Sequence, residues 1–357
     1  MKITNVKLYP VGTRRETAAV TPHIIVTLTT DEGPVGIGEM SDLGHDPVMP
    51  DVDHLEYTLN KSLSGADPFD PERLDPIVDG LRAPLGAGID TALHDLRGKI
   101  LGVPVHDLYG GAYRDRYKIC YPIFRQFDNS QFDLNLDRVK RMLELGFDLF
   151  RFYVGGDVDI DDRLFRTLRD NHGDDFKVKS LDFSCRLDWK QCVAAVERLA
   201  WVEPMLVESP APDIPGKAKV RERIRFPTSE HCNSEAQAIE FAGAVDILNI
   251  AVNSRGIRRA RSLFATAEAL GLKTLIGTTQ ELSIGTSAQG HLGASVPNLE
   301  FPGDAAGAQL YLDDVVVNRV QYEAGHLIIP KGPGLGMELN QENLSKFGSR
   351  TWEFLKK

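Results

Sequence analysis

The chain opens with alternating apolar and polar positions, a pattern typical of short antiparallel strands. Three such segments lie at residues 2–11, 23–30 and 35–39. Asp31-Glu32-Gly33 predicts a tight turn between the second and the third. Helical periodicity follows at Val52–Leu63, Glu72–Leu81 and Gly88–Leu101. Residues 1–115 therefore predict an α+β unit.

From residue 116 onward, an apolar run is followed by a helical stretch at intervals of roughly 25–30 residues. The apolar runs lie near residues 119–124, 148–154, 177–182, 204–208, 225–230, 246–252, 273–278 and 297–301. Strands that alternate with helices form parallel sheets. No GxGxxG segment opens the first helix, so a closed β/α barrel over residues 116–319 is favoured over an open doubly wound sheet.

Two late segments, Val315–Tyr322 and Leu327–Pro330, again have the character of antiparallel strands. They follow the last predicted barrel strand and cannot extend its β/α repeat. We therefore predict that residues 320–357 return to the first unit and complete it.

Composition narrows the possible partners. The net charge of −10 and the lack of a Lys/Arg cluster argue against binding to nucleic acid or to an anionic membrane. No apolar run approaches the ~20 residues of a membrane span, and the first residues resemble a strand rather than a signal peptide. The four cysteines lack CxxC spacing and are predicted to be buried thiols. A cytoplasmic protein that acts on a small molecule is the expectation.

Ionisable residues stand where successive apolar runs end. Asp182 and Glu208 are 26 positions apart, which is one β/α repeat, and Glu230-His231 follows on the next run. The carboxyl ends of barrel strands meet in one pocket, so these groups should gather there. Carboxylate oxygens suit a hard divalent cation. Either acid alone is more simply explained as a helix cap or a solvated loop residue.

Two longer segments carry a family resemblance. Residues 98–111, GKILGVPVHDLYGG, and residues 330–336, PKGPGLG, resemble two signatures of the mandelate-racemase and muconate-lactonising branch of the enolase superfamily. This resemblance implies an N-terminal capping domain completed by the C-terminal tail, and a modified TIM barrel of the (β/α)7β type. It also implies one Mg²⁺ in the barrel, which holds a substrate carboxylate while a base removes the adjacent proton.

The resemblance implies Asp182 and Glu208 as metal ligands, although the family usually has Asn where this chain has Ser184. The third ligand is open. Glu230 aligns with the usual acid, whereas a subgroup with a similar segment uses a His, which favours His231. Adjacent strand residues point to opposite faces, so only one of the two can face the barrel mouth without a bulge.

The expected bases are replaced. Most of the branch has Lys-x-Lys on the second barrel strand, where this chain has Arg151-Phe152-Tyr153; a second common pair aligns with Ala251 and Gly277. Positions i and i+2 share a strand face, so Arg151 can lie beside the Tyr153 hydroxyl and favour its phenolate. We therefore predict Tyr153 as the base and Arg151 as its activator. The alternative is an Arg and a Tyr that only pack in the barrel mouth.

An Arg-x-Tyr pair at this place resembles a galactarate dehydratase group of the family. That group holds a second metal ion in the capping domain, which here implies Asp42 and His45, with Thr278 or Thr279 as a further contact. Its general acid is a Tyr near the start of the third helix. Residues 81–90 contain no Tyr, so this role is unassigned.

Substrate contacts are predicted from Arg14 and Arg15, in the loop that closes over the barrel in relatives, and from His45 and Glu300. Arginine suits a distal carboxylate, whereas a solvated loop is the alternative for the two arginines. The predicted function is a Mg²⁺-dependent sugar-acid dehydratase, a lyase that eliminates water after α-proton abstraction, in a homo-oligomer. The alternatives are a hydroxy-acid epimerase or racemase, and a binding protein that has lost catalysis.

Overall fold

The computed structural model describes residues 1–41, 43–45 and 48–355. Its first sheet is antiparallel, with strand order β1-β2-β3. These strands are β1 (Ile3–Arg14), β2 (Val20–Thr30) and β3 (Val35–Met40). The helices α1 (Val52–Leu63), α2 (Pro71–Gly80) and α3 (Ala83–Leu101) follow. The predicted α+β opening is confirmed, although α3 begins before the predicted Gly88.

Close packing between β3 and α3 depends on glycine. A Cβ added to Gly38 would lie 2.1 Å from the Gly88 carbonyl oxygen, and a Cβ added to Gly36 would lie 2.3 Å from the Ala92 carbonyl oxygen. Only the missing side chains allow the helix backbone to approach the strand this closely. The helix thereby seals one face of the first sheet.

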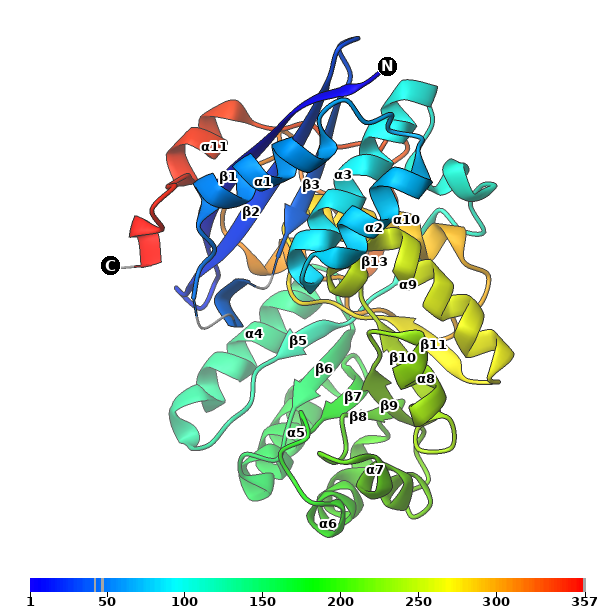
Figure 1. Cartoon of the computed structure of the whole chain (residues 1–357). Helices are drawn as coiled ribbons and strands as arrows, with labels where there is room; N and C mark the ends of the chain where they lie inside the picture. Colours follow the sequence, from blue (N-terminus) through cyan, green and yellow to red (C-terminus); the bar gives the residue numbers. More distant parts are fainter. Residues whose placement is uncertain (42, 46–47, 356–357) are drawn as a thin grey trace.

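The second sheet is parallel and has seven strands in the described part of the chain, in the order β11-β10-β9-β8-β7-β6-β5. The strands are β5 (Tyr121–Ile123), β6 (Leu149–Tyr153), β7 (Lys177–Asp182), β8 (Leu206–Glu208), β9 (Thr228–His231), β10 (Ile247–Ile250) and β11 (Lys273–Ile276). The connecting helices are α4 (Phe132–Glu144), α5 (Val158–His172), α6 (Trp189–Leu199), α7 (Ile214–Arg221), α8 (Glu235–Phe241), α9 (Val252–Ala269) and α10 (Ser283–Ser295). Figure 1 shows these strands side by side beneath the first sheet.

The eighth predicted strand, at 297–301, is not a regular strand, and this prediction is wrong. Instead, the irregular segment Phe301–Asp304 bonds to both ends of the parallel sheet. Asp304 N donates to the carbonyl of Ile276 in β11 at 2.8 Å, and Cys120 N, just before β5, donates to the carbonyl of Gly303 at 2.9 Å. These bonds link the first and the last strand through one short segment.

The C-terminal residues return to the first sheet. A small third sheet joins β12 (Gln321–Glu323) and β13 (His326–Ile328) to β4 (Arg116–Lys118). The tail then reaches α11 (Gln341–Phe347) and lies against β1, where Ser349 N donates to the Pro10 carbonyl at 3.0 Å and Arg350 donates to the Leu8 carbonyl. The outer edge of β1 is thus covered by the tail and by side chains of α1, among them Asn60, which bonds Val6.

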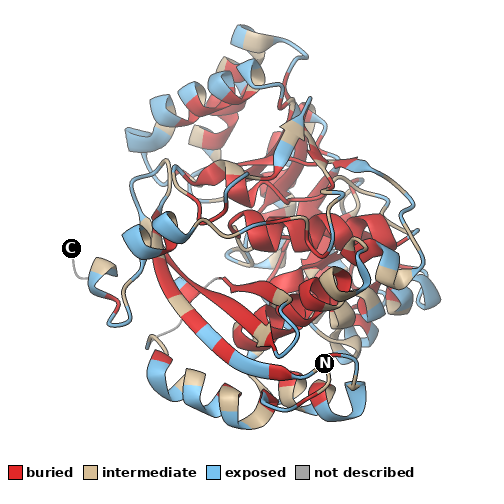
Figure 2. Cartoon of the chain, turned by 90° about the horizontal axis from the view of Figure 1, so that it is seen from above, coloured by how far each residue is buried: buried red, intermediate tan, exposed pale blue. Residues whose placement is uncertain are grey.

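Two main clusters of buried apolar residues support these sheets. One lies between the first sheet and α1–α3 and includes Trp352 of the tail. The larger one fills the space around the parallel sheet. Figure 2 shows buried strands and outer helices with exposed faces. Within the described ranges, no helix combines the length and apolar character needed to cross a bilayer.

Candidate active site

Two polar side chains of β6 point into the interior of the parallel sheet. Phe150 and Phe152 occupy the opposite face of the strand, where the Phe152 ring packs 4.6 Å from that of Phe165 in α5. Arg151 and Tyr153 therefore share the inner face. Arg151 is 2% exposed, and its Nη2 donates to the Tyr153 hydroxyl oxygen at 2.7 Å.

The next two strands deliver the predicted carboxylates. Asp182 of β7 and Glu208 of β8 are paired in register, and both are buried. The strands end sharply there, because Ser184 and Ser209 adopt left-handed φ values of 48° and 47°. Ser184 N and Oγ donate to Asp182 Oδ1 at 2.8 and 2.9 Å. The turn thus fixes one oxygen of Asp182.

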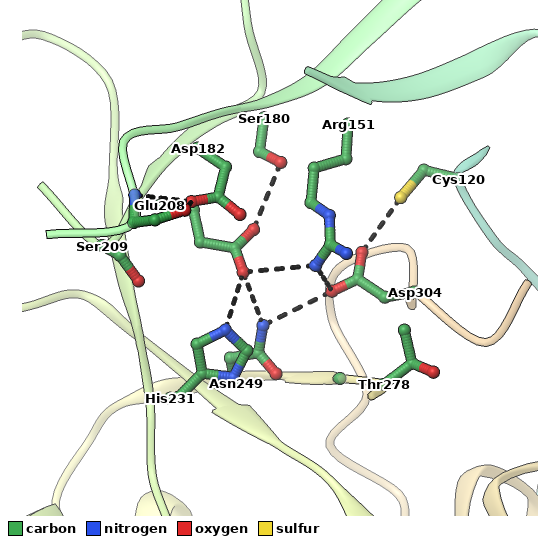
Figure 3. Close-up of polar contacts among 12 residues, drawn as sticks. Cys120, Arg151, Ser180, Asp182, Glu208, Ser209, His231, Asn249, Thr278 and Asp304 are labelled. Atoms are coloured by element: carbon green, nitrogen blue, oxygen red, sulfur yellow. Dashed lines mark hydrogen bonds and ion pairs between the residues drawn. The ribbon is translucent and has the colours of Figure 1, made fainter. Parts of the chain in front are cut away.

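Glu208 lies at the centre of the polar contacts (Figure 3). Its Oε1 lies 3.2 Å from His231 Nε2, 2.9 Å from Asn249 Nδ2 and 3.5 Å from Arg151 Nη1. Ser180 Oγ donates to its Oε2 at 3.3 Å. The carboxylate is therefore surrounded by donors from four neighbouring strands.

The adjacent residues Glu230 and His231 face different surroundings. His231 lines the central pocket, and about 40% of its side chain is exposed. Glu230 instead binds Lys217 Nζ at 3.0 Å and accepts from Ser209 Oγ at 2.9 Å. Strand alternation thus directs the imidazole, and not the carboxylate, toward Glu208.

Burial and charge shift the pKa values of this group. Burial and the neighbouring Glu208 raise the pKa of Asp182. Burial also acts to raise the pKa of Glu208, but Arg151 and His231 hold it below its usual range. Burial acts to lower the pKa of His231, but the bond to Glu208 acts in the opposite direction and holds this pKa above its usual value. A cation near Asp182 and Glu208 would relieve their mutual repulsion.

Burial raises the pKa of the Tyr153 hydroxyl above its ordinary value, and the carboxylates of Asp182, Glu208 and Asp304 act in the same direction. Arg151 opposes this effect, as predicted from the sequence. The sequence-based expectation of a net lowering is nevertheless not met in this arrangement, because burial dominates.

The donor set fits a hard divalent cation in its chemistry, since Asp182 and Glu208 offer buried carboxylates on adjacent strands. Within the described residues, however, no three His, Cys, Asp or Glu side chains converge closely enough to hold an ion. In this conformation His231 bonds Glu208 instead of joining it around a common point.

A pocket of about 430 Å³ opens above these groups. Its lining comprises Arg15, Phe124, Arg125, Arg151, Tyr153, His231, Thr278, Thr279 and Gln280. Phe124 stacks on the Tyr153 ring with 6.4 Å between centroids, and the Arg125 guanidinium lies 5.6 Å from that ring. Neither residue is predicted from the sequence, although both stand where the first predicted apolar run ends.

Of the four predicted substrate contacts, Arg15 lines the pocket. The other three are Arg14, Glu300 and His45. The Arg14 side chain is 63% exposed, pairs with Asp313 and does not line the pocket. Glu300 accepts from Thr274 N near the amino end of β11, away from the pocket, so its predicted place is corrected. The predicted second metal pair lies at the limit of the described residues: Asp42 is outside them, and His45 is described only as the last residue of a 3-10 helix, Leu43–His45.

Three further polar residues beneath the pocket are not predicted from the sequence either. They are Lys179, Asn249 and Asp304. The pairing of β6 with β7 skips Lys179, since Phe150 pairs with Val178 and Arg151 pairs with Ser180. A bulge of this kind turns a side chain out of simple alternation. The only signal in the sequence is a lysine in the middle of an apolar run.

Comparisons with known proteins agree with this architecture. Residues 1–110 match the family model for the mandelate racemase / muconate lactonizing enzyme N-terminal domain, and residues 136–343 match the model for the enolase C-terminal domain-like family. The second match alone covers more than half of the 357 residues.

Individual relatives span nearly the whole chain. A chloromuconate cycloisomerase of Cupriavidus pinatubonensis is 28% identical, with 91% of this chain and 90% of that protein covered. An N-succinyl-L-Arg/Lys racemase of Bacillus cereus is 26% identical, with 97% and 98% covered. The crystal structure of 2-chloromuconate cycloisomerase from Rhodococcus opacus 1CP superposes with a TM-score of 0.84 at 26% identity, with 98% of this chain and 99% of that one covered.

These relatives are isomerases, and they do not support the narrower resemblance to galactarate dehydratases. They do support an α/β enzyme fold with an N-terminal capping domain, as the sequence predicted. Enzymes of this branch generally use Mg²⁺. The chain belongs to the mandelate racemase and muconate-lactonising branch of the enolase superfamily.

Proposed function

We propose that this chain is a Mg²⁺-dependent enzyme that removes the proton α to a carboxylate, with Tyr153 as the base, and then eliminates water from a sugar acid. One observation carries the proposal: Arg151 Nη2 donates to the Tyr153 hydroxyl at 2.7 Å at the wall of the central pocket. A cation within hydrogen-bond distance favours the phenolate over the phenol. Asp182, Glu208 and His231 are the proposed ligands of the metal.

Each residue has a defined part in the first step. Mg²⁺, when bound, would supply positive charge that holds the substrate carboxylate and stabilises the charge that develops on it. Tyr153 accepts the α-proton on its phenolate oxygen. Arg151 keeps that oxygen oriented and offsets part of the effect of burial on its pKa. Phe124 and Arg125 pack against the Tyr153 ring and limit its movement.

Elimination is favoured because the facing strands lack a second strong base at the usual positions. The residue at 251 is Ala, at the carboxyl end of β10, and the residue at 277 is Gly, at the carboxyl end of β11. A Cβ at Gly277 would lie 1.8 Å from Asn249 Oδ1, so a larger side chain cannot be accommodated without displacing Asn249. Reprotonation from the opposite face, which epimerisation requires, therefore lacks those donors.

Epimerisation or racemisation is the second candidate, because His231 lines the same pocket as Tyr153. An imidazole that is free of metal would be a competent proton donor near neutral pH. The relatives named as a racemase and as a hydrophobic dipeptide epimerase of Enterococcus faecalis also make this alternative reasonable. The two candidates share the first proton transfer and differ in the second step, which is loss of water in one case and return of a proton in the other.

The test is a panel of aldonic and aldaric acids, beginning with galactarate, incubated with the protein and Mg²⁺ in heavy water. Dehydration yields a 2-keto-3-deoxy acid, whereas epimerisation yields a deuterated stereoisomer without keto acid; NMR distinguishes them. Tyr153→Phe should abolish both products, since loss of a general base costs ~10²–10⁴-fold. Tyr57→Phe makes the same change at an exposed site and should have no effect. Near wild-type turnover by Tyr153→Phe would refute the assigned base.

Two structural predictions accompany this function. We propose that residues 1–115 together with 320–357 form the capping domain, and that residues 116–319 form a (β/α)7β barrel. The segment Phe301–Asp304, which bonds both end strands, supports closure of that barrel.

A further inference from the structure

Beneath the pocket, four side chains converge on Asp304, which lies in the segment that links β11 to β5. Its Oδ1 contacts Lys179 Nζ at 2.5 Å and Cys120 Sγ at 2.9 Å. Its Oδ2 contacts Arg151 Nη1 at 3.2 Å and Asn249 Nδ2 at 3.4 Å. Asp304 and Lys179 are 2% and 0% exposed.

An ionised carboxylate offers about four lone-pair positions for hydrogen bonds. The four partners of Asp304 occupy them, and the residue does not line the pocket. It therefore has no free oxygen with which to bind a substrate. Its contact nearest to the proposed chemistry is the one to Arg151.

Arg151 is held at both nitrogens of its fork. Nη1 donates to Asp304 Oδ2, and Nη2 donates to the Tyr153 hydroxyl at 2.7 Å. A planar guanidinium bound at one nitrogen has a fixed direction at the other. Asp304 is the nearer of the two carboxylates at Nη1, since Glu208 Oε1 lies 3.5 Å from that atom, and its position therefore helps to fix where Arg151 aims its second donor.

Lys179 supports this arrangement from β7. The bulge that skips Lys179 in the β6–β7 pairing accompanies its turn toward the interior, where it pairs with Asp304. Asp304 thus faces two buried cations, Lys179 and Arg151. Removing either cation would leave the carboxylate only partly compensated, and a buried unpaired charge is strongly unfavourable.

We propose that Asp304 and Lys179 are positioning residues, a buried pair that orients Arg151 so that its Nη2 is aimed at the Tyr153 hydroxyl. The inference rests on the proposed function insofar as Tyr153 is the base. It assigns to the linking segment a part in proton transfer that involves no contact with the substrate.

The first experiment needs no substrate. Arginine side-chain ¹⁵N NMR, with Arg151 assigned through Arg151→Lys, measures rotation of the guanidinium about its Cζ–Nε bond. Resolved, slowly exchanging Nη signals are expected in the wild type and in Glu300→Gln, which makes an acid-to-amide change away from the cluster. The signals should broaden or merge in Lys179→Met/Asp304→Asn, in which one positive and one negative charge are removed together. This charge-balanced variant avoids stranding two buried cations, as Asp304→Asn alone would.

The second experiment is a kinetic cycle with the panel acid that exchanges its α-proton fastest. The double variant should lower kcat roughly 10–100-fold with little change in KM, as is common when supporting partners of a catalytic group are lost. In an Arg151→Lys background the same two changes should lower kcat less than threefold, because residues that act through Arg151 cannot affect the base once Arg151 is absent.

The outcomes separate the two proposals. If Tyr153→Phe keeps its activity, the proposed base is wrong, whereas unchanged Arg151 dynamics in the double variant overturn the positioning pair independently. Two further outcomes apply when Tyr153→Phe is inactive. If the double variant keeps its kcat, Asp304 and Lys179 do not act through Arg151. The same conclusion follows if the two changes lower kcat as much in the Arg151→Lys background as in the wild type. Ordered Arg151 signals that are lost together with kcat support the inference.

Discussion

His231 Nε2 lies 3.2 Å from Glu208 Oε1, whereas the carboxylate of the neighbouring Glu230 is directed to Lys217. The imidazole is therefore the group that shares its surroundings with the proposed metal ligands. Glu230 already has a cation and a hydroxyl as partners, one on each oxygen, so a metal ion would have to compete with them.

We expect His231→Ala to weaken Mg²⁺ binding at least tenfold, because one ligand of three is lost from a site that needs a filled shell. Glu230→Gln should change the affinity less than threefold, since its partners Lys217 and Ser209 lie away from Glu208. Calorimetric titration with Mg²⁺ at pH 8 measures both. A large loss in Glu230→Gln alone would assign the third ligand to the carboxylate instead.

The two loop arginines offer a matched pair for substrate specificity. Arg15 lines the pocket and its Nε has no hydrogen-bond partner among the described residues, whereas Arg14 is exposed and pairs with Asp313. Arg15→Ala should raise KM for a diacid ~10–100-fold, in line with the ~1.5–3 kcal/mol of a hydrogen bond to a charged group. Arg14→Ala should leave KM unchanged.

Steady-state kinetics on the aldaric and aldonic acids of the panel measure this difference. An equal rise in KM for monoacids in Arg15→Ala would show that this arginine does not recognise a distal carboxylate. If Arg14→Ala raised KM for diacids instead, the loop would have to present the other arginine to the substrate.

The stability of the folded protein should depend on pH through Asp161, which is not one of the proposed catalytic residues. It is buried in α5, accepts from Gly155 N at 2.9 Å, and burial raises its pKa to about 7. The folded state therefore holds a proton that the unfolded state releases near pH 3.8. This contribution to stability is present below about pH 4 and is lost as the pH rises toward 7.

Asp161→Asn keeps an acceptor for Gly155 but cannot ionise. Its free energy of unfolding should exceed that of the wild type at pH 8 by no more than about 4 kcal/mol, from ~1.4 kcal/mol per pKa unit, and should match it at pH 4. Denaturant titrations at both pH values measure the difference. Asp159→Asn, which changes an exposed acid of the same helix, is the control; a pH-independent gain in Asp161→Asn would contradict the assignment.

Simple periodicity accounts for the parts of the site that the sequence predicted. Arg151 and Tyr153 share a face because strand alternation has a period of two, and Asp182 meets Glu208 because one β/α repeat separates them. These relations depend only on regular strands. The two relations still hold when the predicted start of a strand is wrong by one or two residues.

Irregular backbone accounts for what the sequence did not predict. Lys179 enters the interior at a bulge, and Asp304 lies in a segment that is no regular strand, so neither obeys the alternation used to choose inward-facing residues. Glu300 is predicted as a site residue because the last strand is expected to end there, at a place where some relatives keep an acid. The pattern does not say which of Glu230 and His231 faces the pocket; in the structure, His231 contacts Glu208 and Glu230 contacts Lys217.

The covering of β1 has a consequence for synthesis of the protein on the ribosome. Ser349, which bonds the Pro10 carbonyl, is made 339 residues after it. At ~5–20 residues per second, that delay amounts to roughly 17–68 s. During this time part of the edge of β1 presents backbone groups that can pair with another chain. The tail can therefore protect this part of the edge only after residue 349 has been made, a property that enzyme assays on purified material would not detect.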